Sequence, residues 1–86
     1  MTQDLPPTPD LPLTLDRLRE GDRRTILDVL GDDAVAVRLM EMGLTDGEPI
    51  EVLGFAPFGD PIEFLIRGYR ISLRANEARR VIVSTK

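Results

Sequence analysis

Two short runs of alternating apolar and polar side chains, joined by a tight turn, constrain the fold of this chain most. The apolar members are Ile62, Phe64 and Ile66 in the first run and Tyr69, Ile71 and Leu73 in the second. An alternation with a period of two residues is typical of strands that bury one face, and Arg67-Gly68 is short enough to close a hairpin. The pattern predicts a hairpin with Ile62, Phe64, Ile66, Ile71 and Leu73 mostly inside.

The remaining chain predicts further short elements. Asp32 and Asp33 precede an apolar stripe at helical spacing, and Gly43 follows it, which is typical of a capped helix. We expect strands at 22–30, 48–55 and 81–83, a helix at 34–42, a tight loop at 57–61 and a helical turn at 75–78. The stripe comprises Val35, Leu39 and Met42, with Ala36 and Met40 beside them, and Ile82 is expected inside. These elements predict an all-β fold: a small, closed or nearly closed barrel of about five strands with one inserted α-helix.

Residues 1–13 differ in composition from the rest of the chain. They contain four prolines, which remove backbone donors and favour extended structure. We therefore predict a disordered proline-rich tail at 1–13 and a folded domain at 14–86, beginning where the Thr14 hydroxyl caps a short turn over 15–18. The P-x-x-P spacing within the tail also allows a docking peptide.

The residue types that are missing exclude several function classes. The chain has no cysteine and no histidine, so disulfides, thiolate metal sites and Ser/His/Asp or Cys/His catalysis are excluded. It also lacks the glycine-rich motifs that bind phosphates. We expect no enzyme activity, no cofactor and no tight ferrous-iron site in the isolated protein, because ferrous iron held for transfer prefers nitrogen or sulfur ligands.

The charge distribution bears on partners and location. The net charge is −4, which disfavours nucleic-acid binding. Residues 1–56 carry twelve acids and five bases, whereas residues 57–86 carry three acids and six bases. No apolar run reaches the roughly 20 residues needed to span a bilayer, and the N-terminus lacks the pattern of a secretion signal. We expect a cytoplasmic protein that does not insert into the membrane.

Two sequence blocks resemble a known family. The first is Arg38–Thr45 with Gly47, and the second runs from Ala56 to Glu63 and continues through Arg67–Arg74, Glu77-Ala78 and Val81–Val83. Together they resemble the FeoA family over about residues 13–84. The resemblance implies an SH3-like barrel with a non-enzymatic role as a partner of FeoB, the membrane ferrous-iron transporter with a GTP-binding domain. The same barrel forms the C-terminal domain of iron-dependent DtxR-type repressors.

The candidate partner surface centres on the loop at 57–61. Phe58 lies between turn-forming residues, so we expect it to be exposed and to anchor a partner, with Asp60 bonding the turn backbone. The candidate partner-binding residues are Pro57, Phe58, Gly59, Asp60, Arg67, Tyr69, Arg70, Arg74, Arg38 and Met42. The alternatives are a purely structural role for these residues, a small nucleic-acid-binding barrel, or a stand-alone sensor like the repressor barrel. Self-association is left open.

Overall fold

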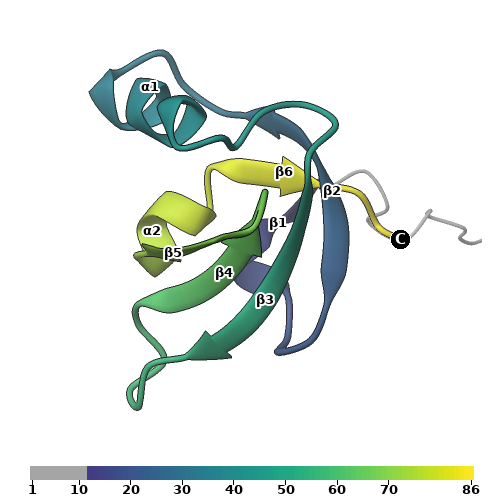
Figure 1. Cartoon of the computed structure of the whole chain (residues 1–86). Helices are drawn as coiled ribbons and strands as arrows, with labels where there is room; N and C mark the ends of the chain where they lie inside the picture. Colours follow the sequence, from purple (N-terminus) through teal and green to yellow (C-terminus); the bar gives the residue numbers. More distant parts are fainter. Residues whose placement is uncertain (1–11) are drawn as a thin grey trace, which may run out of the picture.

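The computed structural model describes residues 12–86 as a small, strongly curved β-sheet with one longer and one short helix beside it (Figure 1). Its elements in chain order are β1 (Leu13–Thr14), the 3-10 turn η1 (Leu15–Arg17), β2 (Arg23–Val29), α1 (Ala34–Glu41), β3 (Pro49–Phe55), β4 (Ile62–Ile66), β5 (Tyr69–Leu73), α2 (Ala75–Ala78) and β6 (Val81–Val83). The predicted all-β class is confirmed, and the strands number six rather than about five.

The strands follow the order β1-β6-β2-β3-β4-β5, and every neighbouring pair is antiparallel. β2 belongs to both halves of the sheet: residues 23–25 pair with β3, and residues 26–29 pair with β6. Irregular register near Ile26 in β2 and Val52 in β3 accompanies the curvature. β1 and β5 remain at the two ends of the order within residues 12–86, so closure is incomplete.

The predicted hairpin of β4 and β5 is confirmed. Ile62 pairs with Leu73, Phe64 with Ile71 and Ile66 with Tyr69. The turn residues Arg67 and Gly68 have φ of 53° and 83°, which matches the right-handed twist of a two-residue hairpin turn. Phe64 has no exposed surface.

Two side chains expected inside, Ile71 and Ile82, lie further out. Ile71 is half-buried on the edge strand β5, and Tyr69, at the turn end of the same strand, is 68% exposed. In β6 the buried residues are Val81 and Val83, so Ile82 lies on the opposite face and is half-buried. Three residues are too few for a period of two to reveal which face is inside.

Helix α1 begins and ends as the sequence predicts. Asp33 is the N-cap, and its carboxylate accepts a hydrogen bond from the backbone N–H of Ala36 at 3.2 Å. Ala36 and Leu39 are buried, whereas Met40 is 42% exposed, so the apolar stripe is narrower than expected. Gly43 follows the helix with φ of 104°, a conformation in which other residues are strained.

The entry to the domain differs from the prediction. Leu13 already belongs to β1, which pairs with β6 through Leu13↔Val83, so the folded domain starts one residue before Thr14. The Thr14 hydroxyl makes no cap; it donates a hydrogen bond to Asp16 Oδ1 at 2.5 Å. The predicted tail lies outside the described residues, apart from Pro12 and Leu13.

Candidate functional site

The β3–β4 loop (residues 56–61) projects from the barrel at the lower left of Figure 1. Two backbone hydrogen bonds close it: Gly59 N–H donates to the carbonyl of Ala56 at 2.7 Å, and Ala56 N–H donates to that of Pro61 at 3.0 Å. Phe58 is 98% exposed at the tip, beside exposed Pro57. The predicted exposure of Phe58 is confirmed: the described residues leave almost all of its side chain in contact with solvent.

Asp60 does not bond its own turn, so that expectation is wrong. Its Oδ1 accepts a hydrogen bond from the backbone N–H of Ala75 at 2.9 Å, at the start of α2, and Arg74 Nη1 lies 3.8 Å from its Oδ2. The free amides at the beginning of a helical turn attract a carboxylate more strongly than an ordinary turn amide does. The base of the loop is therefore fastened to α2 while its tip stays free.

Of the candidate arginines, Arg74 lies at the base of the loop, whereas Arg67 and Arg70 lie elsewhere. Arg67 lies in the β4–β5 turn, at the opposite end of the hairpin from the loop, and its side chain passes Gly43: a Cβ added at Gly43 would lie 3.2 Å from Arg67 Cδ. Tyr69 and Arg70 follow on β5 and are exposed. The four-residue spacing from Ile62 to Ile66 separates the two ends by about 13 Å.

A third group lies in a hollow between α1 and β5. Arg38 and Met42 contribute from α1. The other lining residues are Pro61, Ser72, Leu73, Arg74 and Glu77. Arg38 forms an ion pair with Glu77, whose Oε1 also accepts the backbone N–H of Arg74 at 2.9 Å. Of the ten candidate residues, Arg38, Met42 and Arg74 thus come together in a hollow that meets the base of the loop at Asp60 and Pro61 and does not include Phe58.

Glu77, Pro61 and Ser72 were not among the sequence candidates for this hollow, although Glu77 has the local signal of a residue near the start of a helical turn. Its pairing with Arg38 joins positions 39 apart in the sequence, and no local pattern reveals such a contact.

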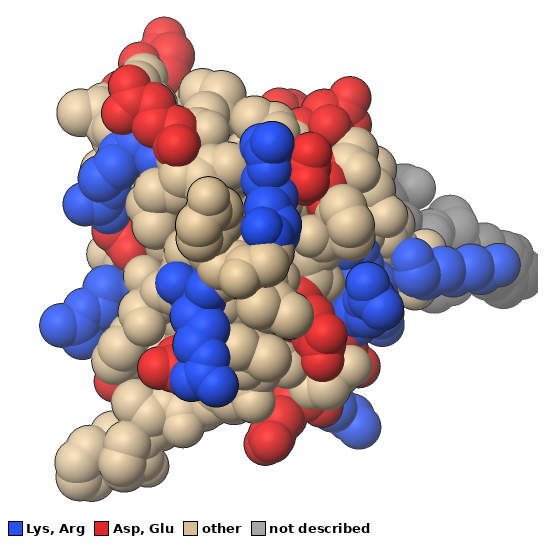
Figure 2. Space-filling view, viewed as in Figure 1, with Lys and Arg blue, Asp and Glu red and all other residues tan. Residues whose placement is uncertain are grey.

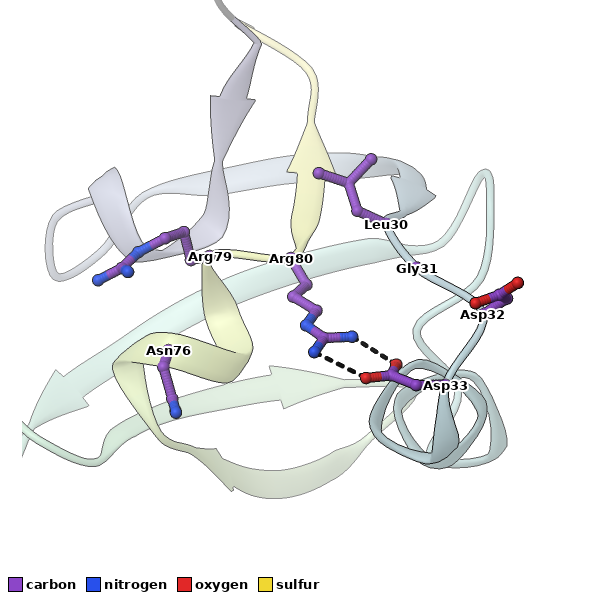
Figure 3. Close-up of a pocket in the computed structure, with 7 residues that line it drawn as sticks. All are labelled: Leu30, Gly31, Asp32, Asp33, Asn76, Arg79 and Arg80. Atoms are coloured by element: carbon purple, nitrogen blue, oxygen red, sulfur yellow. Dashed lines mark hydrogen bonds and ion pairs between the residues drawn. The ribbon is translucent and has the colours of Figure 1, made fainter.

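A second hollow lies at the other end of α1 (Figure 3). Arg80 makes two hydrogen bonds to Asp33, at 2.5 and 2.9 Å, and these bonds, with the one from Ala36 N–H, lower the pKa of Asp33 to about 2. Asp32 and Arg79 lie beside the pair, and Figure 3 shows their side chains pointing away from it. The pair fastens the start of α1 to the segment between α2 and β6 and leaves neither partner as a free acid or base.

The charged side chains of residues 12–86 are distributed over the surface. Figure 2 shows acidic and basic side chains interspersed over one face, with an uncharged tip at lower left where the β3–β4 loop projects. Within residues 12–86, no group of three or more acidic side chains is placed to hold a metal ion. Nor does that part of the chain contain a helix long and apolar enough to cross a bilayer.

Comparison with known proteins adds a family and a fold. The model of the FeoA domain matches residues 13–85. A fusion protein from Porphyromonas gingivalis, described as Fe(2+) transport protein A joined to Fe(2+) transporter FeoB, is 35% identical over 71 residues. That match covers 83% of this chain and 8% of the fusion protein, so the chain spans a small part of that relative's length.

Two solved structures share the architecture. The FeoA protein of Chlorobium tepidum is 42% identical, with a TM-score of 0.76 over 83% of this chain and 68% of its own. The FeoA protein of Stenotrophomonas maltophilia, described as complexed with zinc, is 32% identical, with a TM-score of 0.75 over 84% and 89% of the two chains. It is described as an SH3 domain protein, and the expected SH3-like barrel is thereby confirmed for this chain.

Proposed function

The chain belongs to the FeoA domain family, and on that premise we propose that it is a non-enzymatic interaction module that supports ferrous-iron uptake by binding the cytosolic region of a FeoB-type transporter. The observation that carries the proposal is the placement of Phe58, a fully exposed aromatic at the tip of a loop whose base is fastened by Asp60. A large apolar side chain held in water is a typical anchor for a protein partner.

The fusion protein of P. gingivalis supports the choice of partner. Its two halves are described as an Fe(2+) transport protein A and an Fe(2+) transporter FeoB, in one polypeptide. Covalent joining raises the effective concentration of one module near the other, which is of use when the two bind each other. For this chain we propose the same pairing between separate molecules, at the cytoplasmic side of the membrane.

The chemistry of the surface supports a binding role. The chain has no histidine or cysteine, and the carboxylate of Asp33, in the hollow at the start of α1, is already paired with Arg80. The β3–β4 loop presents exposed Pro57 and Phe58, and the carboxylate of the same loop, Asp60, is bonded to the N–H of Ala75. Such a surface contributes to affinity by burying apolar area, and truncation of a central aromatic anchor typically costs about 2 kcal/mol or more.

The test measures the affinity of the full chain for a purified FeoB cytosolic domain, by calorimetry, for Phe58→Ala and Phe58→Tyr. We expect Phe58→Ala to weaken binding at least about tenfold, which corresponds to about 1.4 kcal/mol, while Phe58→Tyr keeps most of the affinity. Leu27→Ala is the control, because Leu27 is an exposed apolar residue on β2, away from the loop. Equal affinities for Phe58→Ala and the unaltered chain contradict the proposed surface, and no binding by the unaltered chain contradicts the function.

A further inference from the structure

β5 has a free edge. It stands last in the strand order and pairs only with β4 among residues 12–86. A sheet edge presents unpaired N–H and C=O groups to which another extended segment can bind. The expected closure of the barrel would have removed this edge.

The register identifies the groups that face outward. In a hairpin closed by two residues, the flanking pair Ile66↔Tyr69 is hydrogen-bonded, and bonded and non-bonded pairs then alternate along the ladder. Arg70 and Ser72 therefore direct their backbone N–H and C=O groups away from β4. Neither residue makes a further backbone hydrogen bond to another part of the described chain.

There is space beside this edge. The hollow between α1 and β5 has a volume of about 430 Å³, with Met42 and Arg38 on the α1 side and Ser72 on the β5 side. A paired strand lies only about 4.8 Å from its neighbour. An extended segment can thus lie along Ser72 with one face toward half-buried Met42.

The charges indicate what kind of segment fits. Arg70 lies on β5, and Arg67 and Arg74 flank it. Two glutamates lie nearby: Glu77 is paired with Arg38, and Glu63 lies opposite Ser72 on β4. Arg67 and Arg70 have no acidic group within ion-pair distance in the described part of the chain, and Arg74 has only Asp60, at 3.8 Å. A second copy pairing through its own β5 would bring the arginines together, so complementarity favours an acidic partner segment.

We propose that the free edge of β5 and the hollow beside α1 bind an extended acidic segment of a partner protein by strand addition. Backbone hydrogen bonds to Arg70 and Ser72 give affinity, and the arginines select for negative charge. The inference deepens the proposed function, on which it rests for the source of the segment. The contact surface itself is separate from Phe58.

The probe is a synthetic eight-residue peptide that alternates glutamate and valine, compared with the same peptide carrying lysine in place of glutamate. Binding to the full, ¹⁵N-labelled chain is followed by NMR. At saturation we expect hydrogen exchange at the Arg70 and Ser72 amides to slow at least about tenfold, because they gain partners, while the already bonded Ile71 amide changes little. The acidic peptide is expected to bind at least about tenfold more tightly than the basic one.

Two substitutions test the mechanism. Ser72→Pro removes an outward N–H and leaves the bonds to β4 intact, so it should lower the affinity for the acidic peptide at least about tenfold. Ser72→Thr keeps this N–H and should leave the affinity unchanged. Arg70→Glu, which keeps the backbone donor, should reverse the preference between the two peptides. Equal affinities for the two peptides, or changes in NMR chemical shift confined to strands other than β5, overturn the proposal.

Further outcomes separate the sources of failure. Protection of Ser72 without peptide, together with a dimer mass in sedimentation, shows that a second copy occupies the edge and overturns the proposal. Phe58→Ala should leave peptide affinity unchanged. If the peptide binds while the FeoB domain does not, the proposed function is contradicted and strand addition is supported. If the FeoB domain binds while the peptide does not, only strand addition is contradicted.

Discussion

Phe58 and Phe64 are the same amino acid six positions apart, yet one is 98% exposed and the other has no exposed surface. Phe64 belongs to β4, where its face of the strand is the inner one, and it pairs with Ile71 across the hairpin. Phe58 lies in a turn whose backbone bonds are complete without its side chain. The comparison teaches that local backbone geometry, rather than hydrophobicity, decides which ring stabilises the fold and which stays available for binding.

The largest effect is expected at the buried ring. Phe64→Ala should lower the free energy of unfolding by about 3–5 kcal/mol, because it leaves a cavity in the centre of the barrel. Urea denaturation measures this as a fall in the transition midpoint with an unchanged slope. A loss below about 1 kcal/mol would show that the core closes around the gap and would weaken the contrast between the two rings.

The anchor of the loop should have an intermediate effect. Asp60→Ala removes the hydrogen bond to Ala75 N–H and the contact with Arg74, and it should cost about 1 kcal/mol. Asp60→Asn keeps an acceptor for the same N–H and is the matched control. Thermal melts of both variants test this, and a loss of equal size in the two would assign the effect to charge instead of to the hydrogen bond.

A smaller and pH-dependent effect is expected at Asp33. The pairing with Arg80 lowers the pKa of Asp33 to about 2, below its ordinary value near 3.8, so its contribution is present above about pH 4 and is lost as the pH falls toward 2. Asp33→Asn keeps the helix cap and removes the charge. Its melting temperature should therefore lie below that of the unaltered chain at pH 6 and converge with it near pH 2. A gap that stays constant over this range would contradict the assignment.

The smallest effect on stability is expected at the exposed ring. Phe58→Ala should change the free energy of unfolding by less than about 0.5 kcal/mol, because a side chain in full contact with solvent loses no packing when it is truncated. The same urea titration used for Phe64→Ala gives this value. A large loss would mean that Phe58 packs inward in solution, and the loop would then be a part of the core.

The sequence predicted local features well. The alternation around Arg67-Gly68 located β4 and β5, and the aspartate-to-glycine boundaries located α1. Both signals arise from neighbours in the chain. β1 was missed because two residues carry no periodicity, and its partner is β6, about 70 positions away. The edge position of β5 was missed for a related reason, since strand order depends on non-local pairing.

For the candidate site, the sequence predicted that Phe58 is exposed but not how the candidate residues group on the surface. Exposure of Phe58 follows from the turn formers around it, which is local chemistry. The tie from Asp60 to Ala75 and the pair of Arg38 with Glu77 join distant positions, and these contacts divide the candidate residues into separate groups. The sequence gives the charge of an arginine, whereas only the fold shows which acidic side chains pair with it.

The pairing of Leu13 with Val83 brings the first and last strands of the described chain side by side. A linker attached before β1 or after β6 would therefore leave the barrel from the same side. The β3–β4 loop lies on the other side of the view in Figure 1, at lower left, while the C-terminus lies at right. A domain tethered at either end would leave the Phe58 tip unobstructed, and circular permutation through this junction should preserve the interaction surface.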